Sequence, residues 1–201
     1  MKNILTLLAV TILMVACKQQ APREEEIPLT LEEQIAIKIS DELAKNERNA
    51  DIILDHQFGM TRKEVFQHKN KLEKGKRIYG IFKTKNTRIF VYDLNLRGEA
   101  GINKMPVYFD TFYHENRLFR MECKPKIPKG KDIQQVQDAI VNLYEKKYGK
   151  PDFYVPTDTI SNYQTAMWIQ LNQQIEISRD EKEVMMSYTD LQKEEEILED
   201  I

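Results

Sequence analysis

Hydrophobic positions in the first part of the chain recur with a helical period. From Leu31 to Leu43, every fourth residue is a large aliphatic one. Residues four apart share one face of an α-helix, so this spacing predicts an amphipathic helix over residues 30 to about 46. Thr30 and Glu33 form a capping-box sequence at its start, in which each side chain bonds the backbone N–H of the other residue.

A second helix is predicted to begin at Thr61. Thr61 and Glu64 form another capping box, and Met60 and Val65 occupy the two positions of a hydrophobic staple. We expect this helix to end near Gly75, because glycine commonly follows the last helical residue.

From residue 77 the apolar and polar positions alternate, which is the pattern of a half-buried strand. The alternation predicts four strands, over residues 77 to 83, 88 to 96, 105 to 113 and 117 to 124. The turn between the last two is only three residues long, so an antiparallel meander is the simplest pairing.

The same order of patterns then recurs in the second half. Asp132 and Gln135 indicate a helix start, and Gly149 and Pro151 indicate its end. A loop containing Pro156 precedes three further strands, over residues 165 to 171, 173 to 178 and 183 to 189. Together the patterns predict an α+β fold, an antiparallel sheet with helices packed on one face. The recurrence allows two tandem helix-plus-sheet units.

The first 16 residues have the pattern of an export signal. Lys2 precedes an apolar run from residue 4 to residue 16, which is 13 residues long. As a helix this run spans about 20 Å, whereas crossing a bilayer takes roughly 20 residues. A basic start, a short apolar region and small residues before the cut are typical of a secretory signal peptide.

The end of this segment, Met14-Val15-Ala16-Cys17, resembles the lipobox of bacterial lipoproteins. The resemblance implies cleavage before Cys17, a thioether-linked diacylglycerol on Cys17 and an acylated amino group. The alternatives are an ordinary signal peptide that contains a cysteine and a buried apolar N-terminal helix. Lys18, in place of the aspartate that retains lipoproteins in the inner membrane, favours an outer-membrane lipoprotein of the cell envelope. Both the periplasmic side and the cell surface stay open.

Four regions follow from these patterns. They are a signal peptide over residues 1 to 16, a lipidated flexible tether over 17 to 29, a single α+β domain over 30 to 190 and an acidic tail over 191 to 201. The tail is expected to be either a short helix or frayed. The chain has 30 basic and 32 acidic residues and a net charge of −2, so it has no basic excess that would favour nucleic acid.

Lipidation of Cys17 leaves Cys123 without an intrachain partner, because the chain has two cysteines. Strand alternation places Phe119, Met121 and Cys123 on one face. We expect a buried, inert thiol, because reactive thiols need an electropositive and partly exposed setting.

Candidate chemistry is sparse in this sequence. His56, His68 and His114 lie in separate segments without the spacing of a zinc site, and each is expected at the surface or in a turn. The sequence has no glycine-rich phosphate loop and no Gly-x-Ser-x-Gly elbow. We therefore predict no metal, no cofactor and no catalytic residue.

Aromatic residues crowd the third predicted strand, and Tyr108, Phe112 and Tyr113 are candidate partner-binding residues. Alternation must place some of them on each face of a sheet. An exposed aromatic patch would suit a protein partner. The alternative is that these rings fill the core and cross-strand pairs, since aromatic residues are common in strands.

Residues 58 to 65, Phe-Gly-Met-Thr-Arg-Lys-Glu-Val, resemble the helix start of the BamE (SmpA/OmlA) family of small outer-membrane lipoproteins. The wider group with this topology includes the β-lactamase-inhibitor-protein fold. The resemblance implies a fold used for protein contacts in the envelope and carries no catalytic residue across. We therefore expect a non-catalytic lipoprotein that docks with another cell-envelope protein. The alternative, a small-ligand-binding or enzymatic domain with an unrecognised site, requires a deep polar pocket.

Overall fold

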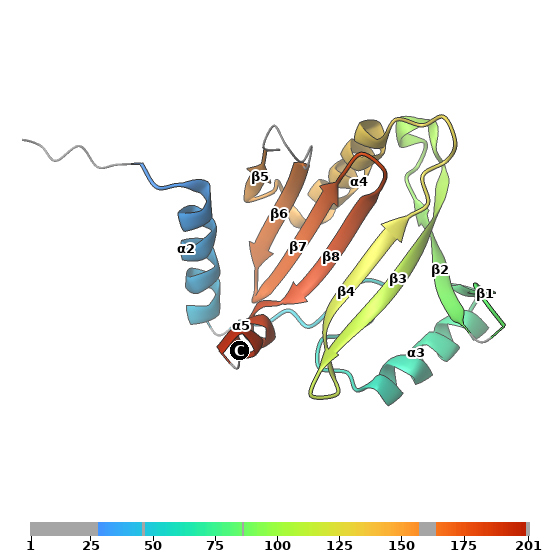
Figure 1. Cartoon of the computed structure of the whole chain (residues 1–201), viewed down its shortest axis with the longest axis horizontal. Helices are drawn as coiled ribbons and strands as arrows, with labels where there is room; N and C mark the ends of the chain where they lie inside the picture. The colour runs from blue at the N-terminus through green and yellow to red at the C-terminus, as the bar shows by residue number, and fades with distance from the viewer. Residues whose placement is uncertain (1–27, 46, 86, 157–163, 200–201) are drawn as a thin grey trace, which may run out of the picture. The chain divides into compact units, whose positions relative to one another are not determined.

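The computed structural model describes residues 28–45, 47–85, 87–156 and 164–199 (Figure 1). From Leu31 onward the chain forms one compact unit, which contains both apolar clusters of the described residues. This unit therefore has its own core. The predicted signal peptide and Cys17 lie outside the described residues, as does most of the predicted tether.

The described part of this unit contains four helices and eight strands. The helices are α2 (Leu31–Ala44), α3 (Arg62–Lys74), α4 (Ile133–Tyr148) and α5 (Leu191–Glu199). The first four strands are β1 (Tyr79–Phe82), β2 (Arg88–Asn95), β3 (Lys104–His114) and β4 (Arg117–Pro125). The other four are β5 (Phe153–Val155), β6 (Gln164–Gln170), β7 (Gln173–Arg179) and β8 (Val184–Asp190). A short 3₁₀ turn, η1 (Glu99–Gly101), lies between β2 and β3.

All eight strands form one antiparallel sheet in the order β1-β2-β3-β4-β8-β7-β6-β5. Each half of the sheet is a four-stranded meander preceded by a helix, α3 before β1 and α4 before β5. The last strands of the two meanders, β4 and β8, pair in the middle, where Cys123 lies opposite Met186. The predicted α+β fold is confirmed, and its strand order contains two helix-plus-meander units.

Local signals explain where the two long helices begin. The Thr61 hydroxyl accepts the backbone N–H of Glu64 at 3.2 Å, and the Glu64 carboxylate accepts that of Thr61 at 2.7 Å, so the predicted capping box of α3 is present. In α4 the Asp132 carboxylate accepts the N–H of Gln134, and Gly149 follows the last turn with a φ of 82°. Glycine adopts this left-handed region without a steric penalty.

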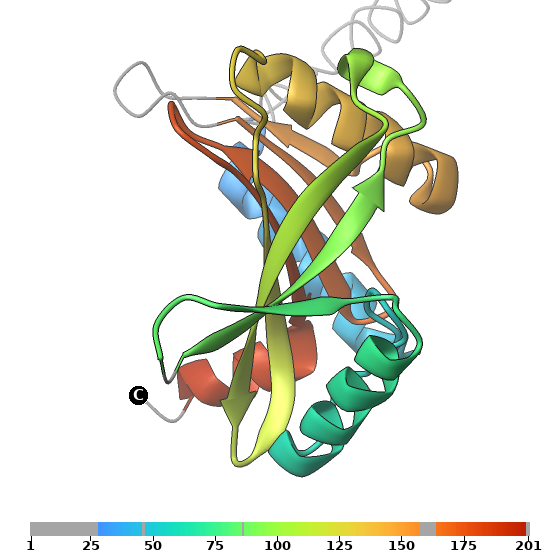
Figure 2. The ribbon, with the colours of Figure 1, turned by 90° about the vertical axis from the view of Figure 1, so that its right-hand side faces the viewer.

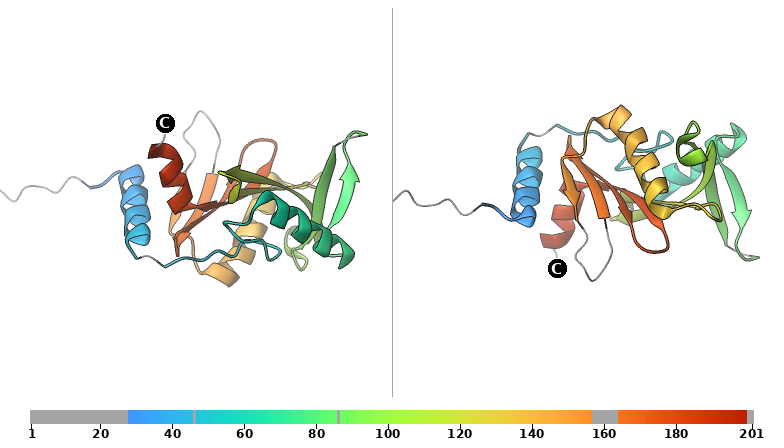
Figure 3. Two further views of the ribbon diagram at one scale, coloured as in Figure 1. Left: turned by 90° about the horizontal axis from the view of Figure 1, so that it is seen from below. Right: turned by 90° about the horizontal axis from the view of Figure 1, so that it is seen from above.

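The helices lie on both faces of the sheet. Ala166 and Trp168 of β6 belong to the larger apolar cluster, on the face covered by α3 and α4. The alternate residues Met167 and Ile169 point the other way, into a smaller cluster with Ile39 of α2. The prediction that helices pack on one face of the sheet is therefore correct for α3 and α4. Helices α2 and α5 cover part of the opposite face. Figure 3 shows α4 and α5 on opposite sides of the strands.

Two local expectations are wrong. The predicted loop before β6 contains the short edge strand β5, whose three residues are too few to show a period. Met121 and Cys123 are fully buried as expected, but Phe119 is not on their face. A β-bulge leaves Phe119 unpaired, and Leu118 takes the core position instead, because one extra residue reverses the alternation beyond it.

Candidate functional site

The candidate site lies on the sheet face opposite α3 and α4, which we call the outer face. Along strands β1, β2 and β3 this face carries apolar side chains. Tyr79 pairs with Val91, and Val91 pairs with Tyr108, so the three form one cross-strand row. Ile81 lies in the next row, opposite Ile89. Tyr79 is 42 % exposed and Ile81 37 % exposed, which leaves an apolar surface in contact with water.

The structure separates the three predicted partner-binding residues. Tyr108 and Phe112 share the outer face of β3, and Phe112 is 39 % exposed opposite Arg120 of β4. Tyr113 lies on the other face, against the main core. Its ring lies 4.3 Å below the guanidinium carbon of Arg62, and its hydroxyl donates to the Thr111 hydroxyl at 3.2 Å. Tyr113 therefore holds α3 against the sheet.

Polar groups border this apolar surface. The Tyr79 hydroxyl donates to the Asp93 carboxylate at 3.4 Å. Partial burial and the negative charge of Asp93 raise the pKa of Tyr79, so its hydroxyl stays a neutral donor. Lys124 lies opposite Tyr108 on β4 and pairs with Glu183. Aromatic rings beside hydrogen-bonding groups are suited to binding another protein.

The prediction that each histidine lies at the surface or in a turn is wrong for His56. His56 is fully buried instead of lying at the surface, and its ring meets that of His68 edge to face, with centroids 4.7 Å apart. Burial lowers the pKa of His56 to about 4. His68 bonds the backbone carbonyl of Leu54 at 2.7 Å. Both rings therefore support the segment before α3. Within the described ranges, no three potential metal ligands come together.

Cys123 has the setting of a structural cysteine. Its thiol is fully buried and unpaired, and burial raises its pKa well above the ordinary range. The thiol is therefore protonated and shielded from reagents. This arrangement provides no nucleophile.

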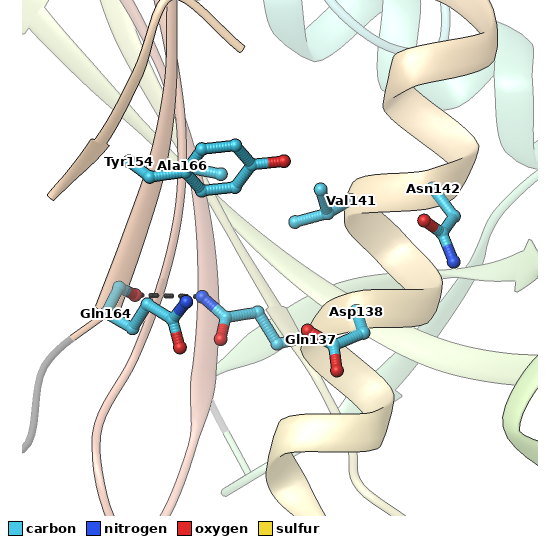
Figure 4. Close-up of a pocket in the computed structure, with 7 residues that line it drawn as sticks. All are labelled: Gln137, Asp138, Val141, Asn142, Tyr154, Gln164 and Ala166. Atoms are coloured by element: carbon cyan, nitrogen blue, oxygen red, sulfur yellow. Dashed lines mark hydrogen bonds between the residues drawn. The ribbon is translucent and has the colours of Figure 1, made fainter. Parts of the chain in front are cut away.

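The hollows among the described residues differ in volume, and one of about 340 Å³ beside Glu99 and Asn142 is open to solvent. Another, between α4, β5 and β6, has a volume of about 130 Å³ and is bordered by Gln137 (Figure 4). The Gln137 amide donates to the backbone carbonyls of Gln164 at 2.8 Å and Ile177 at 3.1 Å, so this side chain joins α4 to the sheet. Pockets for small ligands usually measure 300 to 1,000 Å³. The hollow beside Gln137 therefore does not favour a small-ligand site.

Sequence reasoning missed Tyr79 and Ile81. Both alternate correctly in the predicted strand over residues 77 to 83, but alternation alone does not say that β1 is the edge strand of the sheet. An edge position with no helix above it leaves these residues exposed. The exposure of Tyr79 and Ile81 therefore depends on the strand order of the sheet and not on the local sequence pattern.

Comparisons with protein-family models, with curated proteins and with solved structures gave no match for this chain. The resemblances to the lipobox and to the BamE family therefore stay predictions. In the part of the chain that the structure describes, no helix is both long enough and apolar enough to cross a membrane.

Proposed function

We propose that this chain is a non-catalytic lipoprotein of the bacterial cell envelope, and that it acts through its outer face rather than through a reaction centre. Its domain docks with another envelope protein, and Cys17 anchors it to the outer membrane. The observation that carries the docking role is the group of exposed side chains Tyr79, Ile81 and Phe112 on one face of the sheet.

Physical arguments support a protein partner for this face. Exposed aromatic and aliphatic side chains gain free energy when a partner removes them from water, about 25 cal/mol for each Å² of apolar surface. Large rings at the centre of a contact commonly dominate its energy. Tyr79 and Phe112 supply such rings from β1 and β3, and the sheet holds both in place before binding.

Photo-crosslinking of the full-length lipoprotein in its native membrane tests docking. A photoreactive residue at position 79 or 112 is expected to give one discrete adduct, because both positions face the partner. The same residue at position 198 is the control, since Leu198 is 69 % exposed on α5 and outside the outer-face group. Phe112→Ser is expected to abolish the adduct formed from position 79. Equal crosslinking from positions 79 and 198 would contradict the proposal.

Replacement of the lipidated residue tests the anchor. In the parent chain, mass spectrometry of the N-terminal peptide is expected to find acyl groups on Cys17. Cys17→Ala is expected to abolish this modification and to release the protein from the membrane fraction in a high-salt wash, because the acyl chains provide the anchor and salt screens charge contacts with lipid. The matched variant Cys123→Ala removes the buried thiol and should stay in the membrane fraction. An unmodified Cys17 would exclude the lipoprotein assignment.

A further inference from the structure

Positive charge is concentrated in one short part of the chain. Residues 62 to 88 contain ten basic and two acidic residues, a formal net charge of +8. The rest of the chain contains 20 basic and 30 acidic residues, a net charge of −10. The small overall charge of −2 therefore conceals a strongly asymmetric molecule.

The described residues of this stretch form α3 and β1 and reach the first residue of β2, and we call residues 62 to 88 the basic lobe. Figure 1 shows α3 and β1 at the same end of the sheet, and Figure 2 views that end directly. The two acidic residues are already engaged, Glu64 in the helix cap and Glu73 with Arg88. Neither is free to neutralise a further cation.

The cations of the lobe fall into two chemical groups. All three arginines are occupied within the chain: Arg62 lies over Tyr113, Arg77 pairs with Asp55 and Arg88 pairs with Glu73. Of the seven lysines, Lys69 lies over the ring of Phe109, and six exposed ones have no carboxylate partner among the described residues. They are Lys63, Lys71, Lys74, Lys76, Lys83 and Lys85.

Two exposed aromatic rings accompany these lysines. Phe82 is 70 % exposed and comes directly before Lys83 at the end of β1, and Phe66 is 60 % exposed on α3. The guanidinium carbon of Arg88 lies 5.8 Å from the centre of the Phe82 ring. Exposed apolar rings in a lysine-rich segment are typical of surfaces that lie on a membrane.

We propose that the basic lobe binds the surface of a bilayer that contains anionic phospholipids. The lysines contact the headgroup phosphates, and Phe82 enters the boundary between headgroups and acyl chains. The placement near a bilayer rests on the proposed anchor at Cys17. Leu31 follows Cys17 by 14 positions, which allows a separation of at most about 50 Å.

The chemistry of the lobe favours lipid over a macromolecule with a fixed pattern of charge. Lysine is a mobile point charge, which suits a fluid layer of phosphates, whereas arginine forks suit defined carboxylate or phosphate geometries. The free cations here are all lysines. Nucleic acid is disfavoured because the three arginines of the lobe, whose forks suit the fixed phosphates of a nucleic acid, are occupied within the chain.

Vesicle sedimentation tests the proposal with a fragment of residues 18 to 201, which lacks Cys17 and the apolar N-terminal run but keeps the compact unit with its core. The fragment is expected to bind phosphatidylcholine vesicles that contain phosphatidylglycerol and not vesicles of phosphatidylcholine alone. The double variant Lys83→Glu/Lys85→Glu should weaken binding by roughly thirtyfold or more, since each lysine near an anionic surface contributes about fivefold.

Matched controls separate a local effect from net charge. Lys129→Glu/Lys182→Glu makes the same change of charge on exposed residues outside the lobe and should change vesicle binding by less than about twofold. Phe82→Ser should weaken binding, whereas Leu198→Ser, at an equally exposed position on α5, should not. Circular dichroism verifies that each variant is folded.

Three outcomes would overturn the proposal: no binding to phosphatidylglycerol vesicles, equal losses from the two double variants, or binding to polyglutamate in place of vesicles. The last would identify the lobe as a docking site for an acidic protein. The fragment has neither the lipid anchor nor the envelope partner. Failure here therefore leaves the docking proposal intact, and failure of crosslinking at positions 79 and 112 leaves this one intact.

Discussion

At the scale of single residues, His56 combines burial with a titratable ring. Its Nδ1 lies 3.1 Å from the backbone carbonyl of Ile53, while Nε2 has no hydrogen-bond partner within the described part of the chain. In the neutral ring, an Nδ1–H that donates to this carbonyl leaves Nε2 without a proton. A proton on Nε2 would place an unpaired charge inside the core.

Acidification is expected to destabilise the domain through His56. Between pH 6.5 and about 4, the unfolded chain binds a proton at His56 that the folded chain does not. The free energy of unfolding therefore falls as the pH falls through this window, by about 2 kcal/mol between pH 7 and pH 5. Urea unfolding at the two pH values measures this loss.

Two variants isolate the contribution of His56. His56→Gln should lose much less stability between pH 7 and pH 5, because it cannot take up the proton. His114→Gln, at the end of β3, should retain the parent's dependence, because His56 is intact. An unchanged pH dependence in His56→Gln would contradict the assignment.

At the scale of elements, α3 depends on its cap. Thr61→Ala removes the hydroxyl that accepts the N–H of Glu64, and we expect it to lower the free energy of unfolding by about 1 kcal/mol. Glu64→Gln is the matched control, because glutamine still accepts the N–H of Thr61, and its loss should be smaller. Thermal and urea unfolding measure both. Equal losses would show that charge, not the cap hydroxyl, stabilises this helix start.

The elements also show which features local sequence can predict. Helix α3 and seven of the eight strands, all but the three-residue β5, were predictable because their caps and periods are local signals. The bulge at Phe119 was not, since the extra residue is defined by its pairing with another strand. Alternation along β3 does separate Tyr113 from Tyr108 and Phe112, but which of the two faces is the outer one depends on contacts with distant segments. The cover that α2 and α5 give to that face depends on contacts between distant segments.

At the scale of the whole domain, β8 joins the two halves of the sheet. It pairs with β4 on one side and β7 on the other. Deletion of residues 184 to 201 would leave both of these strands as open edges, and open edges pair with other chains. We therefore expect this truncated chain to aggregate. Size-exclusion chromatography tests this, with deletion of residues 192 to 201 as the control, which keeps the buried Leu191 and should stay monomeric. A monomeric, folded product of the longer deletion would contradict this role of β8.

The position of β8 also has a consequence for the order of folding. This strand is the last of the described strands along the chain, yet it lies at the centre of the sheet, and its residue Met186 is 63 positions from its partner Cys123 on β4. Closing such a long loop costs entropy before the pairing stabilises it, which slows folding. During synthesis or export, the first meander can form while β4 remains open. Until the C-terminal strand arrives, chaperone binding and association between chains compete with completion of the sheet.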